Sequence, residues 1–282
     1  MPRADAIAGP SMRRAAVAIA RGPRGSTVTR AYAESPLKWL TPANRGTAAW
    51  LFAASYGGGL VGGDHLSIEV DVDPGAAALL STQASTKVYR SPAGASARLA
   101  ARVGADGVLV SLPDPVVCFA SSDYRQTQAF TIHPSAGLVA LDWVASGRRG
   151  SGERWAFDGY ASTTVLRVGE RLVLHDAVRL SACDGDLGAR AGRIDVLAAV
   201  VLAGERVAAM AAGVVANVAA RPVERRATVL VSAAPLPGQA YAPPGCVLRV
   251  AGTEVEEVRR LLRTLLDFVP GLLGDDPWAR KW

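Results

Sequence analysis

The sequence has few of the residues that build covalent frameworks or static metal sites. Its 282 residues include 3 cysteines and 3 histidines. Cys118, Cys183 and Cys246 lie far apart and form no C-x-x-C pair, which argues against a zinc framework, a redox motif or a disulfide network. No H-E-x-x-H motif and no G-x-S-x-G serine occurs either. The residues therefore offer no assembled machinery for a hydrolase or a metalloenzyme.

Long apolar runs are absent as well. The most apolar stretch, Val207 to Ala220, is broken by Asn217 and is shorter than the ~20 residues that a helix needs to cross a bilayer. Near the N-terminus, the apolar run Ala15 to Ala20 is too short for a secretory signal. We expect a cytoplasmic protein that has no membrane partner.

Lysine is scarce, although the net charge is +6. The lysines are Lys38, Lys87 and Lys281, and the arginines are scattered in short pairs such as Arg148-Arg149. Nucleic-acid-binding proteins gather basic residues on one face, where the side chains neutralise phosphates. The scattered charge favours a protein that has no nucleic acid partner.

Hydrophobic residues are abundant, at 50% of the sequence against 20% for charged residues. This composition excludes a mainly disordered chain and supplies a large core. One β-rich domain can use the whole length. We therefore expect a single domain over residues 1–282, with disorder confined to about the first 20 residues.

Short strands separated by turns recur along the chain. Leu66 to Asp73 alternates aliphatic and mainly acidic residues, which indicates a half-buried strand with a solvated acidic face. Pro74-Gly75 ends it, and we expect Ala76 to Gln83 to pair with it. Thr164 to Val168 and Arg171 to His175 flank Gly169-Glu170, which predicts a tight hairpin. Further strands are predicted at residues 97–103, 108–112, 128–132, 138–144, 194–202, 227–232 and 246–250.

Two helices are predicted among these strands. One runs from Glu205 to about Asn217, and the other from Glu254 to about Val269, where aliphatic residues repeat at helical spacing. Thr253 and Glu256 form a potential capping box for the second helix, and Pro270-Gly271 would end it. That helix could cover the core or dock a helical partner, and core packing is the simpler expectation. The proline-rich stretch 234–245 should be a loop, so the fold class is mostly β with two α-helices.

A glycine-rich run, Gly57 to Gly62, satisfies the pattern G-x-G-x-x-G. A dinucleotide site needs a helix to begin at the last glycines, and here an alternating strand begins at Leu66 instead. No Gly-Lys-Ser/Thr follows, so a nucleoside triphosphate loop is excluded too. We interpret the glycines as residues that allow a sharp connection between two strands.

Two polar segments each leave two interpretations open. Ser81 to Arg90 is rich in hydroxyls and amides, and it would suit either a solvated turn or the wall of a hydrated cavity. Gly147 to Trp155 places Glu153 among arginines, which is typical of an ion-paired loop. Alternatively, Glu153 is partly buried and binds a cation or fixes a partner surface.

Taken in order, these segments resemble the UreD (also called UreH) family of urease accessory proteins. The resemblance covers roughly residues 35–180 and includes Ser35-Pro36-Leu37-Lys38 and Leu112 to Val116. It also includes the runs Gly57 to Asp64, Pro74-Gly75-Ala76 and Thr82 to Arg90, in the same order and spacing. Among the matching positions are Gly62, Gly63, Asp64, Thr82, Gln83, Ser85, Thr86, Lys87, Tyr89, Arg90, Gly147, Arg148, Gly152 and Glu153.

The resemblance implies a scaffold with a helically wound, β-superhelix-like sheet and no catalytic activity. It implies binding to the helical protein UreF, through UreF to the GTPase UreG, and to the urease apoprotein. It also implies that nickel passes through an internal, water-filled route, with no tightly bound cofactor.

Four carboxylates are candidate oxygen donors along such a route: Asp64, Glu153, Asp142 and Asp176, together with Gln83, Ser85 and Thr86. A transit path needs weak donors that release the ion, so scattered oxygens suit it better than a closed cage. Only Asp64 and Glu153 belong to a matching motif. For each acid alone, a turn or a salt bridge is an equally good explanation.

Two alternatives come from other classes of protein. A β-fold hydrolase could use Asp64 and Glu153 as an acid/base pair if their carboxyls lay ~5 to 9.5 Å apart in one cleft. A purely structural scaffold would bind its partners without admitting metal. A continuous polar cavity would count against that second alternative.

Overall fold

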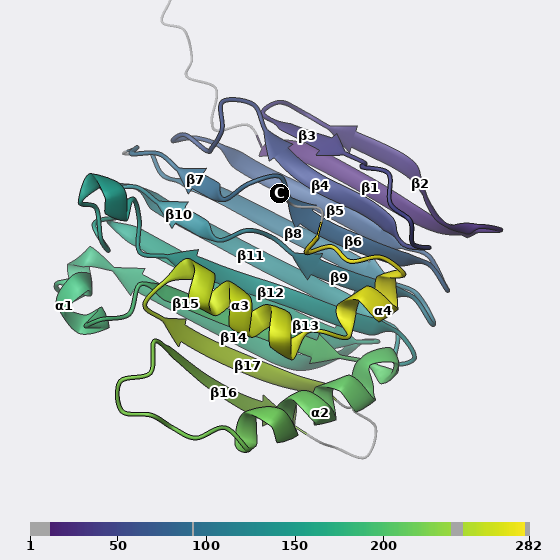
Figure 1. The fold of residues 1–282 in the computed structure, drawn as a ribbon. Coiled ribbons are helices and arrows are strands. Elements are labelled where there is room, and N and C mark those ends of the chain that lie inside the picture. The colour runs from purple at the N-terminus through teal and green to yellow at the C-terminus, as the bar shows by residue number, and fades with distance from the viewer. Residues whose placement is uncertain (1–11, 92, 238–244, 280–282) are drawn as a thin grey trace, which may run out of the picture.

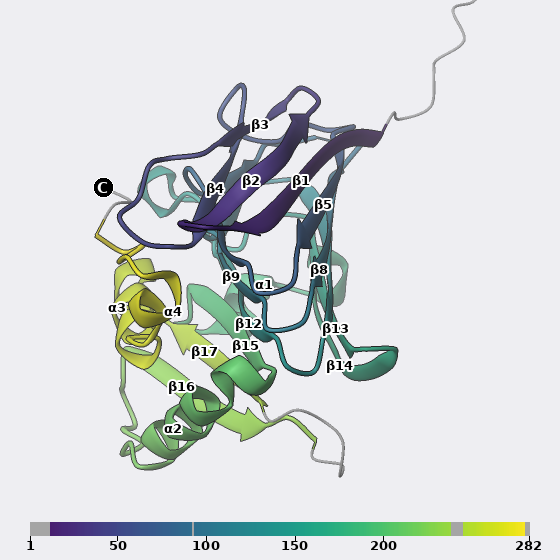
Figure 2. The same cartoon turned by 90° about the vertical axis from the view of Figure 1, so that its right-hand side faces the viewer.

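The computed structural model describes residues 12–91, 93–237 and 245–279. Its strands form two sheets that face each other (Figures 1 and 2). The seven-stranded first sheet has the order β14 (Arg171–Ser181), β13 (Gly159–Val168), β11 (Asp123–Ile132), β8 (Ala95–Val103), β5 (His65–Val72), β1 (Met12–Gly22) and β2 (Gly25–Ala33). The ten-stranded second sheet has the order β16 (Val229–Pro235), β17 (Gly245–Gly252), β15 (Val196–Ala203), β12 (Gly137–Ala145), β9 (Val108–Leu112), β6 (Ala77–Thr82), β4 (Ala49–Ser55) and β3 (Leu37–Leu40), with β7 (Thr86–Val88) and β10 (Val116–Cys118) at its side.

Through its middle part the chain alternates between the two sheets. β5, β8 and β11 lie in the first sheet, and β6, β9 and β12, which follow them in turn, lie in the second. Within each sheet these strands pair in parallel, as β5 with β8 and β6 with β9. The predicted pairing of Ala76–Gln83 with the preceding strand is therefore wrong. The turn at Gly75, where φ is 68°, carries the chain to the opposite sheet instead of back along the same one.

The mostly-β prediction is confirmed, whereas the finer description as a β-superhelix stays a prediction. The predicted hairpin is also confirmed, because β13 and β14 are antiparallel and Val168 pairs with Arg171. Gly169 has a φ of 55° in the tight turn between them, where glycine fits without steric cost.

The N-terminal segment is more ordered than predicted. β1 begins at Met12 and lies between β2 and β5, and its side chains Ala15, Val17 and Ile19 are buried. The expected disorder is therefore wrong for residues 12–20, while residues 1–11 lie outside the described part. Strand-like alternation of Ala and Val in this segment was readable in the sequence, but its short apolar side chains give a weak signal.

The described residues contain four α-helices, two more than predicted: α1 (Leu187–Ala191), α2 (Ala208–Ala219), α3 (Val255–Leu265) and α4 (Val269–Leu273). Short 3-10 helices lie at Arg149–Ser151, Ala182–Asp184 and Glu205–Val207. None of the helices in these ranges is long and apolar enough to cross a membrane.

The ends of α3 differ from the prediction. The N-cap is Glu254, which makes no side-chain capping bond, so the predicted capping box of Thr253 and Glu256 does not form. The Glu254 carboxylate binds Arg149 instead, with Oε1 2.7 Å from Nη1. Pro270 does not end the helical structure either. It lies in the first turn of α4, where proline costs no hydrogen bond.

Helices α2, α3 and α4 cover the outer face of the second sheet (Figure 2). Val258, Leu262 and Leu265 of α3 are buried in one cluster with sheet residues such as Val200 and Leu248. This confirms the expectation that α3 packs on the core. Two further buried clusters lie between the sheets, one around Phe130 and Leu138 and the other around Tyr124 and Tyr160.

Candidate functional site

A layer of polar side chains lies between the two sheets, with an apolar cluster on each side of it. On the inner face of the first sheet, Gln126 pairs in register with Ser162, and in the next inward row Gln128 pairs with Thr164 and Thr164 with Asp176. The rows beside them are apolar, because Phe130 pairs with Leu166 and Tyr124 with Tyr160.

The second sheet contributes one row to the same layer. Asp142 of β12 pairs with Ala199, Ala199 pairs with Arg249, and Arg249 pairs with Ser232. Because side chains in a strand point to alternate faces, residues paired in this way share a face. The polar residues thus cross the strands as a band that runs toward the β16 and β14 edges of the two sheets.

Asp142 ties the two sheets together within this layer. Its Oδ1 accepts a hydrogen bond from Nε2 of Gln126 at 2.6 Å, and its Oδ2 accepts one from Oγ of Ser162 at 2.5 Å. Burial raises the pKa of the Asp142 carboxyl above its usual value. The two hydrogen bonds oppose this shift, and the charge of Asp176 adds to it. Ionisation of Asp142 therefore lowers the free energy of unfolding, because the carboxylate is poorly solvated.

Two cavities have Asp142 in their walls. The first has a volume of about 220 Å³ and the second about 340 Å³, and both are lined by Asp142 and its neighbour Trp143. Polar residues of the first cavity wall include Ser81, Thr82, Gln83, Ser85, Thr86, Ser111, Gln126 and Gln128, and Arg98 and Asp114 are charged residues of the same wall. Polar residues of the second are Tyr160, Ser162, Thr164, Asp176, Ser232 and Arg249. The layer therefore contains space on both sides of one carboxylate.

The polar segment 81–90 divides between the two interpretations that its sequence allowed. Thr82, Gln83, Ser85 and Thr86 line the first cavity, as a cavity wall requires. Lys87 and Arg90 are exposed and do not line it. Tyr89 does not line it either, and its ring packs edge-on against Phe119 with centroids 5.1 Å apart. The hydroxyl-rich first half thus lies at the cavity, and the charged second half faces solvent.

The glycine-rich loop holds this segment in place. Leu60 N donates to Lys87 O at 2.8 Å, and Tyr89 N donates to Leu60 O at 2.9 Å. A Cβ on Gly59 would lie 2.7 Å from Lys87 O, so only glycine permits the close approach. Gly62 is equally constrained, because its Cβ would overlap Ser91. The loop has no helix after it, which confirms that it is a strand connection and not a dinucleotide site.

Asp64 closes a turn next to that loop. Gly63 precedes it with a φ of 89°, and Oδ2 of Asp64 accepts a hydrogen bond from Val61 N at 2.8 Å. Neither cavity is lined by Asp64. The structure therefore places this motif residue in a local turn, away from the polar layer.

Glu153 forms an ion pair with Arg148 in a loop that Gly147 and Gly152 close with positive φ. Oε2 of Glu153 accepts from Arg148 Nε at 3.0 Å and from Ala120 N at 3.1 Å. The hydrogen bond from Arg148 lowers the pKa of Glu153. Glu153 lines neither cavity, so the ion-paired loop is the interpretation that the structure favours. Neither of these two cavities in the described part of the chain brings Asp64 and Glu153 together, as the hydrolase alternative requires.

Asp176 lines the second cavity with Asp142 and pairs with an arginine from the opposite sheet. Arg249 Nη2 lies 2.6 Å from Oδ1 of Asp176, and Nη1 lies 3.0 Å from Oδ2. Asp176 was a predicted site residue and Arg249 was not, because nothing in the sequence shows that β14 and β17 face each other. Of the four predicted acids, the structure thus brings two to one cavity.

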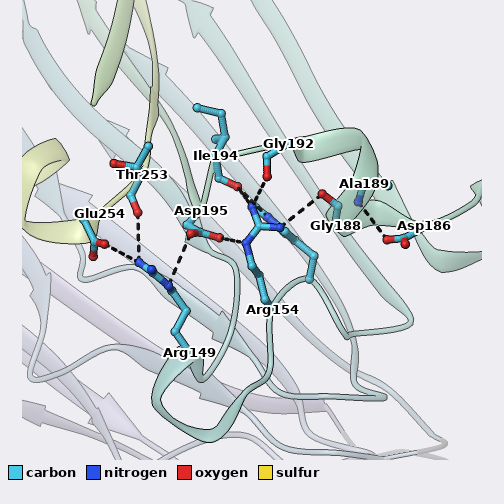
Figure 3. Close-up of polar contacts among 11 residues, drawn as sticks. Arg149, Arg154, Asp186, Gly188, Ala189, Gly192, Ile194, Asp195, Thr253 and Glu254 are labelled. Carbon is cyan, nitrogen blue, oxygen red and sulfur yellow. Dashed lines mark hydrogen bonds and ion pairs between the residues drawn. The ribbon is translucent and has the colours of Figure 1, made fainter. Parts of the chain in front are cut away.

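A second polar network, also missed, lies at Asp195 (Figure 3). Arg154 Nε lies 2.6 Å and Arg149 Nε 3.5 Å from the Asp195 carboxylate, and the Asp195 side chain is 7% exposed. Arg154 also donates to the carbonyls of Gly188, Gly192 and Ile194, at 3.3, 2.6 and 3.0 Å. The network joins the 147–155 loop to α1, β15 and the start of α3. The arginines were visible as an ion-paired loop, but their distant partner was not.

The position of Asp142 predicts a pH dependence of stability. Because its folded-state pKa is raised, ionisation costs stability: the cost is absent below the unfolded pKa and grows as pH rises toward the folded pKa. We expect Asp142→Asn to gain stability relative to wild type as pH increases from about 4 to 7. Urea unfolding at a series of pH values measures the difference. If the difference in unfolding free energy between the two proteins did not change with pH, the pKa of Asp142 would not be shifted.

The sequence matches one family over nearly the whole chain. The family model described as "UreD urease accessory protein" matches residues 12–282. A "Urease accessory protein UreD" of Sorangium cellulosum (strain So ce56) is 54% identical over 259 residues, which are 92% of this chain and 81% of that protein.

Two further relatives extend the comparison to another bacterium and to a plant. A "Urease accessory protein UreD" of Anaeromyxobacter sp. (strain Fw109-5) is 46% identical over 266 residues, which are 94% of this chain and 88% of that protein. A "Urease accessory protein D" of Oryza sativa subsp. japonica is 39% identical over 209 residues, 72% of this chain and 68% of that protein. The chain belongs to the UreD family of urease accessory proteins.

Proposed function

We propose that this protein, which its family assigns to urease maturation, passes nickel ions through the polar layer between its two sheets. The observation that carries the proposal is the position of Asp142, which lines both cavities. Family membership agrees with the prediction that the protein is an accessory protein and not an enzyme.

The chemistry of the layer suits an ion in transit. Nickel(II) accepts carboxylate, amide, hydroxyl and water oxygens. The Asp142 carboxylate accepts hydrogen bonds from Nε2 of Gln126 and Oγ of Ser162, and an ion that binds Asp142 would displace these hydrogen bonds. A carboxylate that already has neutral hydrogen-bond donors attracts a cation without enclosing it. An ion that enters the first cavity can therefore be exchanged to the second without a long residence.

We infer the partners from the family resemblance. They are UreF, through UreF the GTPase UreG, and the urease apoprotein, which receives the nickel. The first cavity would take the ion from one side of this assembly and the second would release it on the other. The route is internal, so the ion is shielded from competing ligands while it moves.

Urease activation in cells that carry the other accessory genes and nickel tests the proposal. We expect activation with the wild type, none without it, and a decrease of roughly ten-fold with Asp142→Asn, because the variant keeps the size of the side chain and removes its charge. Asp64→Asn is the matched control and should activate urease like the wild type.

Co-purification with UreF separates the two explanations of a loss. If Asp142→Asn loses activation but still binds UreF, the defect lies in metal handling. Equal activation by Asp142→Asn and wild type would contradict the proposed route. No activation by the wild type with matched partners would contradict the function as a whole.

A further inference from the structure

We propose that Arg249 is a movable plug in the second cavity: its guanidinium occupies the place beside Asp176 that a divalent cation would take, and it leaves that place when an ion passes. The inference rests on the proposed nickel route and deepens it by naming the group that controls release. Arg249 belongs to none of the motifs that carry the family resemblance.

The ion pair of Arg249 and Asp176 lies where the polar layer reaches the edge of the fold. β14, which carries Asp176, is the edge strand of the first sheet, and β17, which carries Arg249, is next to the edge strand β16 of the second. The pair therefore spans the gap between the sheets at their open edge. An ion that leaves the second cavity on this side has to pass it.

The two side chains of the ion pair differ in their exposure to solvent. The Asp176 side chain is 14% exposed, whereas the Arg249 side chain is 54% exposed. Asp176 is thus fixed in the cavity wall, and the long arginine side chain has solvent on its outer side into which it can turn. The pair is bidentate, but because the guanidinium is half exposed, water can take over its hydrogen bonds when the side chain turns outward.

The charged side chains that line the second cavity indicate how Arg249 affects cation binding. The charged or titratable side chains that line it are Asp142, Tyr160, Asp176 and Arg249. With Arg249 in place the second carboxylate is neutralised, and only Asp142 attracts a cation. Without Arg249, two carboxylates and the oxygens of Ser162 and Thr164 face one space of about 340 Å³. That set would bind a divalent cation tightly, so the arginine keeps the cavity from retaining its cargo.

The alternative is a clasp that only holds the two sheets together. A clasp and a plug both predict some loss of thermal stability when Arg249 is removed, so stability does not separate them. Affinity for a cation does, because only the plug competes with the ion for Asp176.

Nickel(II) binding to the purified full-length protein tests the proposal by isothermal titration calorimetry. We expect Arg249→Ala to bind nickel at least about ten-fold more tightly than the wild type, because a positive charge has been removed from beside the site. The gain should disappear in the double variant Arg249→Ala/Asp176→Asn. Arg249→Lys, which keeps the charge, should stay near the wild type.

Arg179→Ala is the matched control. Arg179 also lies on an outer strand and pairs with one carboxylate, that of Asp184 at 2.8 Å, but it lines neither cavity. It should leave nickel affinity unchanged. Arg249→Gln, which keeps most of the side chain and loses the charge, replaces Arg249→Ala if circular dichroism shows that the alanine variant is unfolded.

A folded, uncharged variant at position 249 with wild-type nickel affinity would overturn the plug. So would an equal gain in Arg179→Ala, since the effect would then follow from net charge alone. These results are independent of urease activation: the nickel route fails if Asp142→Asn activates urease like the wild type, and the plug fails if the nickel affinity of the purified Arg249 variants does not change.

Discussion

Ala199→Phe should abolish urease activation while leaving the protein folded. Ala199 lies between Asp142 and Arg249 in the inward row of the second sheet, and it lines the second cavity. A phenyl group there would fill the space through which the proposed route runs. The cavity already offers room for the ring, so the substitution need not displace the core as overpacking elsewhere would. We expect activation at the level seen without the protein, measured in cells with matched expression.

The control for this substitution is Ala161→Phe. Ala161 pairs with Arg125 and Arg179 on the outer face of the first sheet, so a ring at that position meets solvent instead of the cavity. Its activation should match the wild type. Normal activation by a folded Ala199→Phe protein would mean that nickel does not pass through the second cavity.

The largest loss of stability is expected for Asp195→Ala. The substitution leaves the guanidinium groups of Arg149 and Arg154 without the carboxylate that both contact. Removing one partner from a buried ion pair leaves an uncompensated charge, and because both arginines are partly exposed we expect a loss of about 2–4 kcal/mol. Equilibrium unfolding in urea measures this loss, which corresponds to a fall in Tm of roughly 5–15 °C.

Asp184→Ala provides the comparison for that measurement. Asp184 pairs with Arg179 on the surface, where its side chain is 41% exposed, and exposed pairs contribute little. Its unfolding curve should lie close to that of the wild type. If both variants lost the same stability, the Asp195 network would not be the anchor of the 147–155 loop.

Much of the fold could be predicted because strands carry a local signal. The strand predicted at residues 108–112 coincides with β9, and the hairpin at Gly169-Glu170 joins β13 to β14. Which strands pair was not predictable in the same way. The turn at Pro74-Gly75 fits a return along the same sheet as well as a crossing to the opposite one, and only tertiary packing decides between them.

The candidate site was harder to predict from the sequence than the fold. The motif acids Asp64 and Glu153 lie in loops, where a turn and an ion pair account for them. Asp142 had a signal of its own, since it is a lone acid in an otherwise apolar strand. The alternation that places Gln126 and Ser162 on inward faces could be read strand by strand. Their contact with Asp142 could not be predicted, because it depends on the register between strands and on how the two sheets face each other. Spacing along the sequence does not give either.

Nickel transfer in the presence of an external chelator tests the central claim most directly. Purified assembly of this protein with UreF and nickel-loaded UreG would be mixed with apo-urease and excess EDTA, and urease activity followed over time. An internal route predicts that activation by the wild type persists, because the ion between the sheets is out of reach of the chelator, and that Ala199→Phe gives none. Complete loss of wild-type activation in EDTA would contradict the account, because the ion would then travel through bulk solvent.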